Sequence, residues 1–247
     1  MARNKYYSYI FISIVAILSA GLLSFVSAVL KPRQEINEAV EKKKNIMIAL
    51  GSLKRSKKVS QSEIIDLFHK SVEVMVVNNL GKQVALPDAI KAENIDPEIE
   101  SQKSIESRYL PIYLQKEAGK IEAYCLPVSG KGLWSTIYGY LALEKNLNTI
   151  RGLIFYKQAE TPGLGAEIST AQFTSKFIGK KIFDGQGKLI SIKITKLAMV
   201  ESSPDFDHSI DGISGATKTC DGVEELLLTG LQTYSAFINN MRLENED

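Results

Sequence analysis

An uninterrupted apolar run occupies the beginning of the chain. Residues 6–30 contain no charged side chain, and basic residues stand on both sides of them. A helix needs about 20 apolar residues to cross the hydrocarbon core of a bilayer. The pattern predicts one transmembrane helix in contact with membrane lipid, with residues 1–32 as an N-terminal transmembrane anchor.

A cleaved signal peptide is the alternative interpretation of this run. Residues 26–28 read VSA, which resembles a cleavage site. The apolar region of a signal peptide usually has only about 7–15 residues. The greater length here favours a retained anchor, whereas cleavage after Ala28 would release a secreted protein.

Helical periodicity resumes beyond the anchor. Residues 33–50 are predicted to form a helix that is broken at its start by Pro32, and residues 33–59 form a juxtamembrane helix and linker. Ser60 and Glu63 make a capping-box pattern ahead of a second apolar stripe. Residues 72–77 are predicted to form a buried strand, and residues 88–107 a polar surface excursion.

The central part of the chain is rich in β-branched and aromatic residues. Short turns separate three such segments, at residues 120–128, 134–143 and 150–158. They predict an antiparallel meander. A short helix is expected to start near Ser169 or Thr170, and alternation over residues 188–198 predicts another strand.

The last segment carries the clearest amphipathic helix. Apolar residues recur at spacings of three and four from Val223 to Met241, which predicts a helix ending near Arg242. Residues 60–247 therefore form one α+β domain, with an antiparallel sheet and a C-terminal helix, behind a single N-terminal transmembrane helix.

Charge and cysteine content exclude several classes. The net charge is only +2, so the chain is not expected to bind nucleic acid. Two cysteines, Cys125 and Cys220, are too few for a disulfide framework. Two unpaired thiols are favoured, and a single disulfide between them is the alternative. His69 and His208 form no metal-ligand pattern, and no metal is expected.

Small and hydroxyl-bearing residues, DGISGATKTC at 211–220, stand directly before the last helix. The free amides and positive dipole end of a helix start can hold a phosphate. Gly212, Gly215 and Ala216 would leave its approach open. The alternative is a turn and a helix cap with no ligand.

A second glycine-containing stretch, ETPGLGAEI, covers residues 160–168. Leu164 is flanked by two glycines, so its apolar side chain can lie against a flat aromatic ligand. A connecting loop without a ligand is the alternative. An alternative role for Glu160 is a hydrogen bond to the loop rather than to the ligand.

DGISGAT resembles the covalent flavinylation motif of the FMN-binding domain family, in which a flavin transferase esterifies FMN through its phosphate to the final Thr or Ser. The apolar span running into KPRQE, followed by KKKNIMIALG, GLWSTIYGY and ETPGLGAEI, extends the likeness over nearly the whole chain. In these motifs the chain resembles the family of C subunits of the sodium-translocating NADH:quinone reductases.

The resemblance implies a set of cofactor-binding residues. Thr217 would be the attachment residue, with Thr219 and Ser214 as competing hydroxyls. Lys218 stands where an apolar residue is expected, and would contact the phosphate or point to solvent. The other implied positions are Asp211, Ser214, Gly215 and Ala216 of the motif, and Thr161, Leu164, Trp134 and Tyr138 around the flavin ring. For the two aromatic residues, burial in the core is the alternative.

The resemblance also implies a function. The chain would be the FMN-bearing electron carrier of a translocase that couples NADH oxidation and ubiquinone reduction to Na⁺ export. It would not be catalytic alone, since no acid–base constellation is visible. Its partners would be the other membrane and peripheral subunits, and the flavin transferase during maturation.

The resemblance places the chain in the bacterial inner membrane as a single-pass protein, with the domain in the periplasm. Charge counting opposes this orientation, because more cations follow the apolar run than precede it. Two alternatives are the G subunit of the related RNF electron-transport complex, and a membrane-anchored binding or assembly protein without a cofactor.

Overall fold

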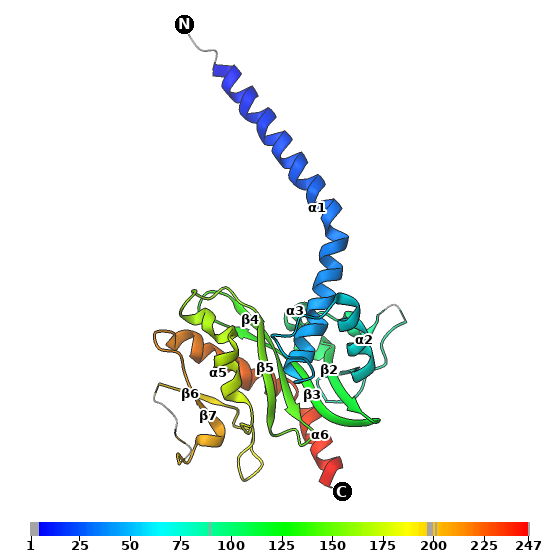
Figure 1. Ribbon diagram of the computed structural model, residues 1–247, viewed down its shortest axis with the longest axis vertical. Helices are drawn as coiled ribbons and strands as arrows, with labels where there is room; N and C mark the ends of the chain where they lie inside the picture. Colours follow the sequence, from blue (N-terminus) through cyan, green and yellow to red (C-terminus); the bar gives the residue numbers. More distant parts are fainter. Residues whose placement is uncertain (1–4, 89, 197–199, 201, 247) are drawn as a thin grey trace. The chain divides into compact units, whose positions relative to one another are not determined.

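The computed structural model describes residues 5–88, 90–196, 200 and 202–246 (Figure 1). The chain divides into two compact units, Met1–Lys42 and Lys43–Asp247. Within the described residues, one helix is long and apolar enough to cross a membrane, and it is α1 (Lys5–Ala49). The expected break at Pro32 is wrong: Pro32 lies inside α1. A proline inside a helix costs one backbone hydrogen bond, and the helix-forming residues around it maintain the helix.

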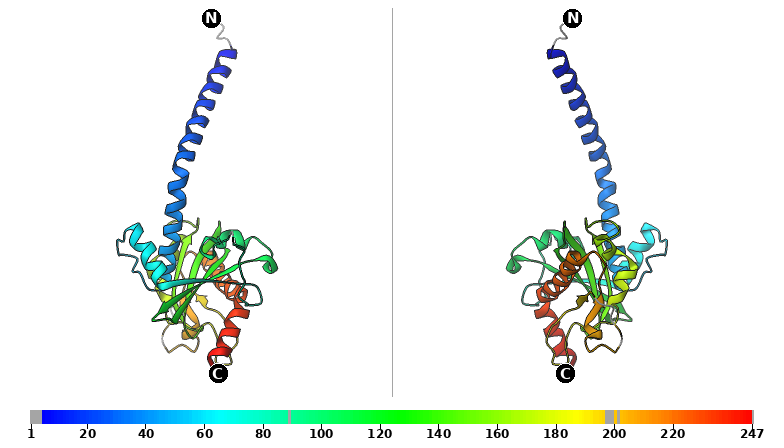
Figure 2. Two further views of the ribbon diagram at one scale, coloured as in Figure 1. Left: turned by 90° about the vertical axis from the view of Figure 1, so that its right-hand side faces the viewer. Right: turned by 90° about the vertical axis from the view of Figure 1, so that its left-hand side faces the viewer.

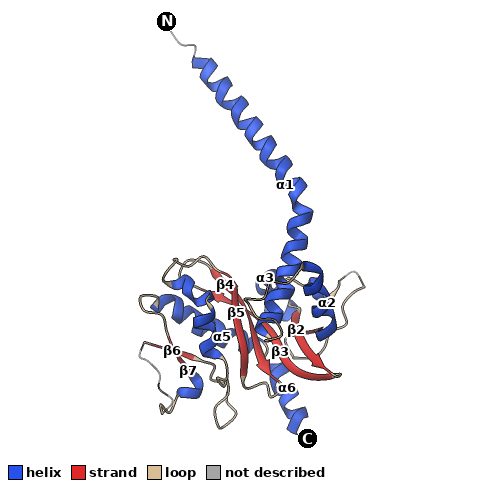
Figure 3. Ribbon diagram, in the orientation of Figure 1, coloured by secondary structure: helices blue, strands red, loops and turns tan. Residues whose placement is uncertain are grey.

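The second unit is built on one antiparallel sheet with strand order β1-β2-β3-β4-β5. Figure 3 draws the strands in red. Its strands are β1 (Val72–Val77), β2 (Leu110–Glu117), β3 (Lys120–Lys131), β4 (Thr136–Glu144) and β5 (Ile150–Lys157). The predicted meander of β3, β4 and β5 is confirmed by their pairing. The sequence pattern did not reveal β2, which pairs with both β1 and β3.

Two hydrophobic cores lie on opposite faces of the sheet, because successive side chains of a strand point to opposite sides. The larger core joins Ile137 and Leu141 of β4 to the helices α5 (Thr217–Thr233) and α6 (Ser235–Glu246). The smaller core joins Tyr140 of β4 to the end of α1 and to α2 (Gln61–Ser71). Figure 2 shows the green sheet between α2, in cyan, and the orange and red helices.

The end of α1 belongs to the second unit. Ile46, Met47 and Leu50 are fully buried in the smaller core together with Phe68 of α2. The predicted linker, residues 33–59, therefore contributes its second half to the compact unit that begins at Lys43.

The helix starts follow the expected capping chemistry in three cases. Ser60 accepts a hydrogen bond from the Glu63 amide at the start of α2, as predicted. Asp96 caps α3 (Pro97–Ser101), and Thr170 caps α4 (Ala171–Thr174) close to the predicted helix start. Short 3₁₀ helices complete the unit: η1 (Ala92–Asn94), η2 (Ile105–Ser107), η3 (Gly165–Ser169), η4 (Ser175–Phe177) and η5 (Phe206–His208).

Two predicted elements need correction. The single C-terminal helix is two helices, α5 and α6, interrupted at Tyr234, whose hydroxyl donates to the Pro111 carbonyl at 3.1 Å. The strand predicted at 188–198 is reduced to β6 (Lys193–Thr195), which pairs in parallel with β7 (Ser209–Asp211); residues 197–198 lie outside the described residues. A positive φ of 61° at Ser191 interrupts the alternation.

Candidate functional site

The DGISGAT segment forms a turn between β7 and α5. Asp211 is the last residue of β7, and Thr217 is the first residue of α5. The Ala216 amide donates to the Ile213 carbonyl at 3.1 Å, and Gly215 takes a φ of 78°, which favours glycine. The side chain of Thr217 is exposed on this turn.

The start of α5 has no side-chain cap. Its N-cap residue is Ala216, whose methyl group accepts no hydrogen bond, in contrast to Ser60, Asp96 and Thr170 at the starts of α2, α3 and α4. The first amides of a helix have no partner within the helix and carry the positive end of its dipole. An anion attached to Thr217 would therefore meet open amide groups.

The structure separates the three competing hydroxyls. Thr217 and Ser214 are exposed, whereas Thr219 is 2% exposed and donates its hydroxyl to Glu160 Oε2 at 2.6 Å. Lys218 projects into solvent, with its ammonium 3.7 Å from the Asp221 carboxylate one turn further along the helix. Thr217 is thus the exposed threonine of the two.

Three of the predicted ring neighbours adjoin this turn. Leu164 is half exposed, and a Cβ placed on Gly215 would lie 3.0 Å from Leu164 Cδ2. The Trp134 indole donates to Thr161 Oγ1 at 3.2 Å, and its side chain is 70% exposed. Trp134 is therefore not a core residue, and it contacts Thr161 of the loop whose Leu164 lies beside Gly215 of the turn.

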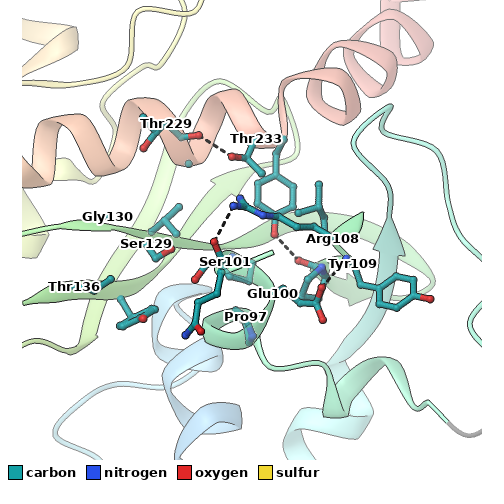
Figure 4. A pocket seen from close by; sticks show the side chains of 18 of the residues that line it. Pro97, Glu100, Ser101, Arg108, Tyr109, Ser129, Gly130, Thr136, Thr229 and Thr233 are labelled. Carbon is teal, nitrogen blue, oxygen red and sulfur yellow. Dashed lines mark hydrogen bonds between the residues drawn. The ribbon is translucent and has the colours of Figure 1, made fainter. Parts of the chain in front are cut away.

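Tyr138 lies elsewhere. It is two residues from Tyr140 on β4, on the sheet face opposite to α5, and its ring lies 6.4 Å from that of Tyr156. It lines a cavity of about 540 Å³ that also takes in residues of β3, α3 and the end of α5, so this cavity is not confined to one face of the sheet (Figure 4). Trp134, Thr161, Leu164 and Thr217 do not line that cavity. The structure thus brings together three of the four predicted ring contacts.

A buried carboxylate lies beneath the two loops. Glu160 is 4% exposed and accepts hydrogen bonds from Thr219 Oγ1, from the Trp134 amide at 3.0 Å and from the Leu133 amide at 3.2 Å. Burial raises the pKa of this carboxyl, but these hydrogen bonds outweigh burial and hold the pKa below its usual range. The sequence allowed for a hydrogen bond from Glu160 to the loop, but it did not indicate Thr219 as a partner of Glu160. The only sequence signal for Thr219 is its position next to the motif.

Acid should weaken the fold through Glu160. The folded-state pKa of Glu160 lies below its unfolded value of about 4.3. The ionised carboxylate therefore adds to the free energy of unfolding above that pH, and this contribution is lost as the pH falls through the folded-state pKa. We expect the gap in free energy of unfolding between wild type and Glu160→Gln to shrink from pH 6 to pH 3. Urea titrations of both proteins measure this difference. A difference that stays constant with pH would contradict an ionised Glu160 in the folded protein.

The sequence profile of the FMN-binding domain matches residues 132–232. That stretch contains the Trp134 loop, the 160–168 loop and the turn that ends at Thr217. The fold and the site therefore define a protein with an FMN-binding domain.

Relatives narrow the class further. The chain is 34% identical to the C subunit of the Na(+)-translocating NADH-quinone reductase of Pseudomonas aeruginosa, over 93% of each chain. It is 33% identical to the same subunit of Neisseria meningitidis serogroup A, again over 93% of each chain. The chain belongs to the family of C subunits of the Na(+)-translocating NADH-quinone reductases.

Solved structures agree with this assignment. The C subunit from Parabacteroides distasonis superposes with a TM-score of 0.71 at 31% identity, over 85% of this chain and 96% of that one. NqrC of Shewanella oneidensis gives a TM-score of 0.72 at 28% identity, over 84% of this chain and 99% of that one. The α+β fold predicted from the sequence is confirmed.

Proposed function

We propose that this chain is the electron-carrier subunit of a Na⁺-translocating NADH:quinone reductase, and that it carries FMN esterified through its phosphate to Thr217. One observation carries the proposal: an exposed threonine opens a 17-residue helix that lacks a side-chain cap, inside the motif DGISGAT. A phosphodiester placed there is stabilised by the open amides and the helix dipole.

Attachment is a phosphoryl-group transfer without oxidation or reduction. Thr217 Oγ forms a bond to the flavin phosphorus, and a phosphoanhydride bond of the activated flavin donor breaks. The hydroxyl proton leaves with the released phosphate group. The flavin transferase recognises the turn through Asp211, Ser214, Gly215 and Ala216, while Lys218 stays at the solvent side.

The side chains around the turn fit a flavin. Trp134, Thr161 and Leu164 supply an aromatic face, a hydroxyl and an apolar side chain next to the attachment turn. When bound, FMN supplies the redox chemistry, and the protein contributes position and local electrostatics. Tyr138 is left out of the proposed ring site, because it lies on the other face of the sheet.

The proposal extends to location and partners. α1 anchors the chain in the bacterial inner membrane, and the domain faces the periplasm, where it exchanges electrons with other subunits during ubiquinone reduction coupled to Na⁺ export. Membership in the family of C subunits supports this role over that of the RNF G subunit. A covalent bond keeps the flavin in place in a compartment where free FMN is scarce.

Peptide mass spectrometry on native membranes tests the proposal. Trypsin cuts after Lys196 and Lys218, which separates Thr217 from Thr219. We expect peptide 197–218 to carry the mass of FMN less water, with fragment ions placing it on Thr217. Unmodified peptides from a host that contains the flavin transferase would contradict the proposal and favour a cofactor-free anchored binding protein.

A further inference from the structure

We propose that the buried Glu160 carboxylate is the positioning residue for flavin attachment. It holds the two flavin-contacting loops against the first turn of α5, and it withdraws the Thr219 hydroxyl so that Thr217 alone is modified. The inference rests on the proposed function, since it assigns the origin of site selection in the same turn.

Glu160 connects three separate segments through one side chain. The Leu133 and Trp134 amides come from the connection between β3 and β4, Glu160 itself follows β5, and Thr219 belongs to α5. Hydrogen bonds to a charged acceptor are about twice as strong as neutral ones. The loop that carries Trp134, the loop that carries Leu164 and the attachment turn are therefore fixed to a common point.

The backbone around Glu160 is shaped to admit the carboxylate. A Cβ on Gly132 would lie 2.5 Å from Glu160 Oε1. A Cβ on Gly165 would lie 2.5 Å from Thr219 Oγ1 and 3.0 Å from Glu160 Cβ. Any side chain at either glycine would displace the carboxylate or its partner, so both positions serve this contact.

Helix geometry explains why the two threonines differ. Thr217 and Thr219 are two residues apart, which places their side chains about 200° apart around the helix axis. Thr217 faces solvent, and Thr219 faces Glu160. A phosphodiester on Thr219 would also bring a second negative charge beside a buried carboxylate, which is strongly unfavourable. Glu160 therefore opposes modification at Thr219 by both access and charge.

Three variants at Glu160 and Thr219 test the inference together with two that lack Thr217, each produced in full length with the flavin transferase. Glu160→Gln keeps the shape but presents an amide to the surrounding N–H donors. Thr219→Val replaces the hydroxyl with a methyl group, and Thr219→Ser is the matched control because it keeps the donor. The readouts are the rate of covalent flavin incorporation by fluorescence after denaturation, the modified residue by peptide mapping, Trp134 emission, and circular dichroism.

We expect Glu160→Gln and Thr219→Val to slow flavin incorporation by about tenfold, the factor for one lost charge-assisted hydrogen bond, with Thr219→Ser unchanged. In a Thr217→Ala/Glu160→Ala double variant, which removes both the charge and the acceptor of the Thr219 hydroxyl, flavin should appear on Thr219, whereas Thr217→Ala alone should carry none. If Glu160→Gln does not fold, the rate of flavin incorporation in Thr219→Val, compared with that in Thr219→Ser, tests the inference.

The possible failures are distinguishable. Wild-type incorporation rates in Thr219→Val, together with an unmodified Thr219 in the double variant, would overturn the role of Glu160 while leaving flavin on Thr217 intact. Absence of covalent flavin from the wild-type protein would instead overturn the proposed function.

Discussion

Thr217→Ala is expected to abolish covalent flavin and, with it, electron transfer through this subunit. The variant removes the one accessible threonine hydroxyl of the motif, because Thr219 is buried against Glu160. Alanine is a good helix former, so α5 should begin as before. Flavin fluorescence of the denatured subunit and NADH-dependent quinone reduction by the assembled complex should both fall to background.

Two control variants separate loss of the hydroxyl from disturbance of the turn. Thr217→Ser keeps a hydroxyl at the same place and should retain covalent flavin. Ser214→Ala changes an exposed neighbour in the same turn and should leave the modified residue unchanged. Flavin that survives denaturation in Thr217→Ala would show that another residue is the point of attachment.

Gly222→Val is expected to be among the most destabilising substitutions in the domain. A Cβ at this position would lie 2.5 Å from the Lys131 carbonyl oxygen, so α5 would have to move away from β3. Overpacking of this kind costs about 1–3 kcal/mol, and valine in place of glycine at an open helix position would stabilise by a few tenths. We expect the free energy of unfolding to fall by about 3 kcal/mol, measured in urea.

Gly185→Val is the matched control for this substitution. A Cβ on Gly185 has no atom within 4 Å, so its effect should stay within about 0.5 kcal/mol. Because α5 also presents Thr217, Gly222→Val should slow flavin incorporation. Equal stabilities of the two variants would mean that α5 does not depend on the close approach of Gly222 to β3.

Local patterns were enough to predict much of the fold. Alternation and turn residues located β3, β4 and β5, and Ser60 located the start of α2. β2 escaped because it has a proline near its start, and polar residues at 115–117 follow its apolar stretch. The break at Tyr234 escaped because the apolar spacing of three and four residues continues through it, and the contact of its hydroxyl with Pro111 joins residues more than a hundred positions apart.

In the site, too, the local features were predictable from the sequence and the long-range contacts were not. The motif is contiguous, so the sequence placed Thr217 at a helix start, and the structure agrees. The partnership of Glu160 with Thr219 joins residues 59 positions apart and was not predictable from either neighbourhood. The position of Tyr138 depends on strand register, since a shift by one residue exchanges the two faces of a sheet.

The alanine before α5 has a consequence for the order of events in maturation. A Ser, Thr, Asn or Asp at that position would contribute about 0.5–2 kcal/mol to the helix but would occupy its first amides in advance. With Ala216 there, the newly folded chain carries a helix end without a side-chain cap, which the proposed phosphodiester on Thr217 would complete. The cofactor would then act as a structural residue added after translation, and we expect a flavinylated subunit to resist unfolding more than its precursor.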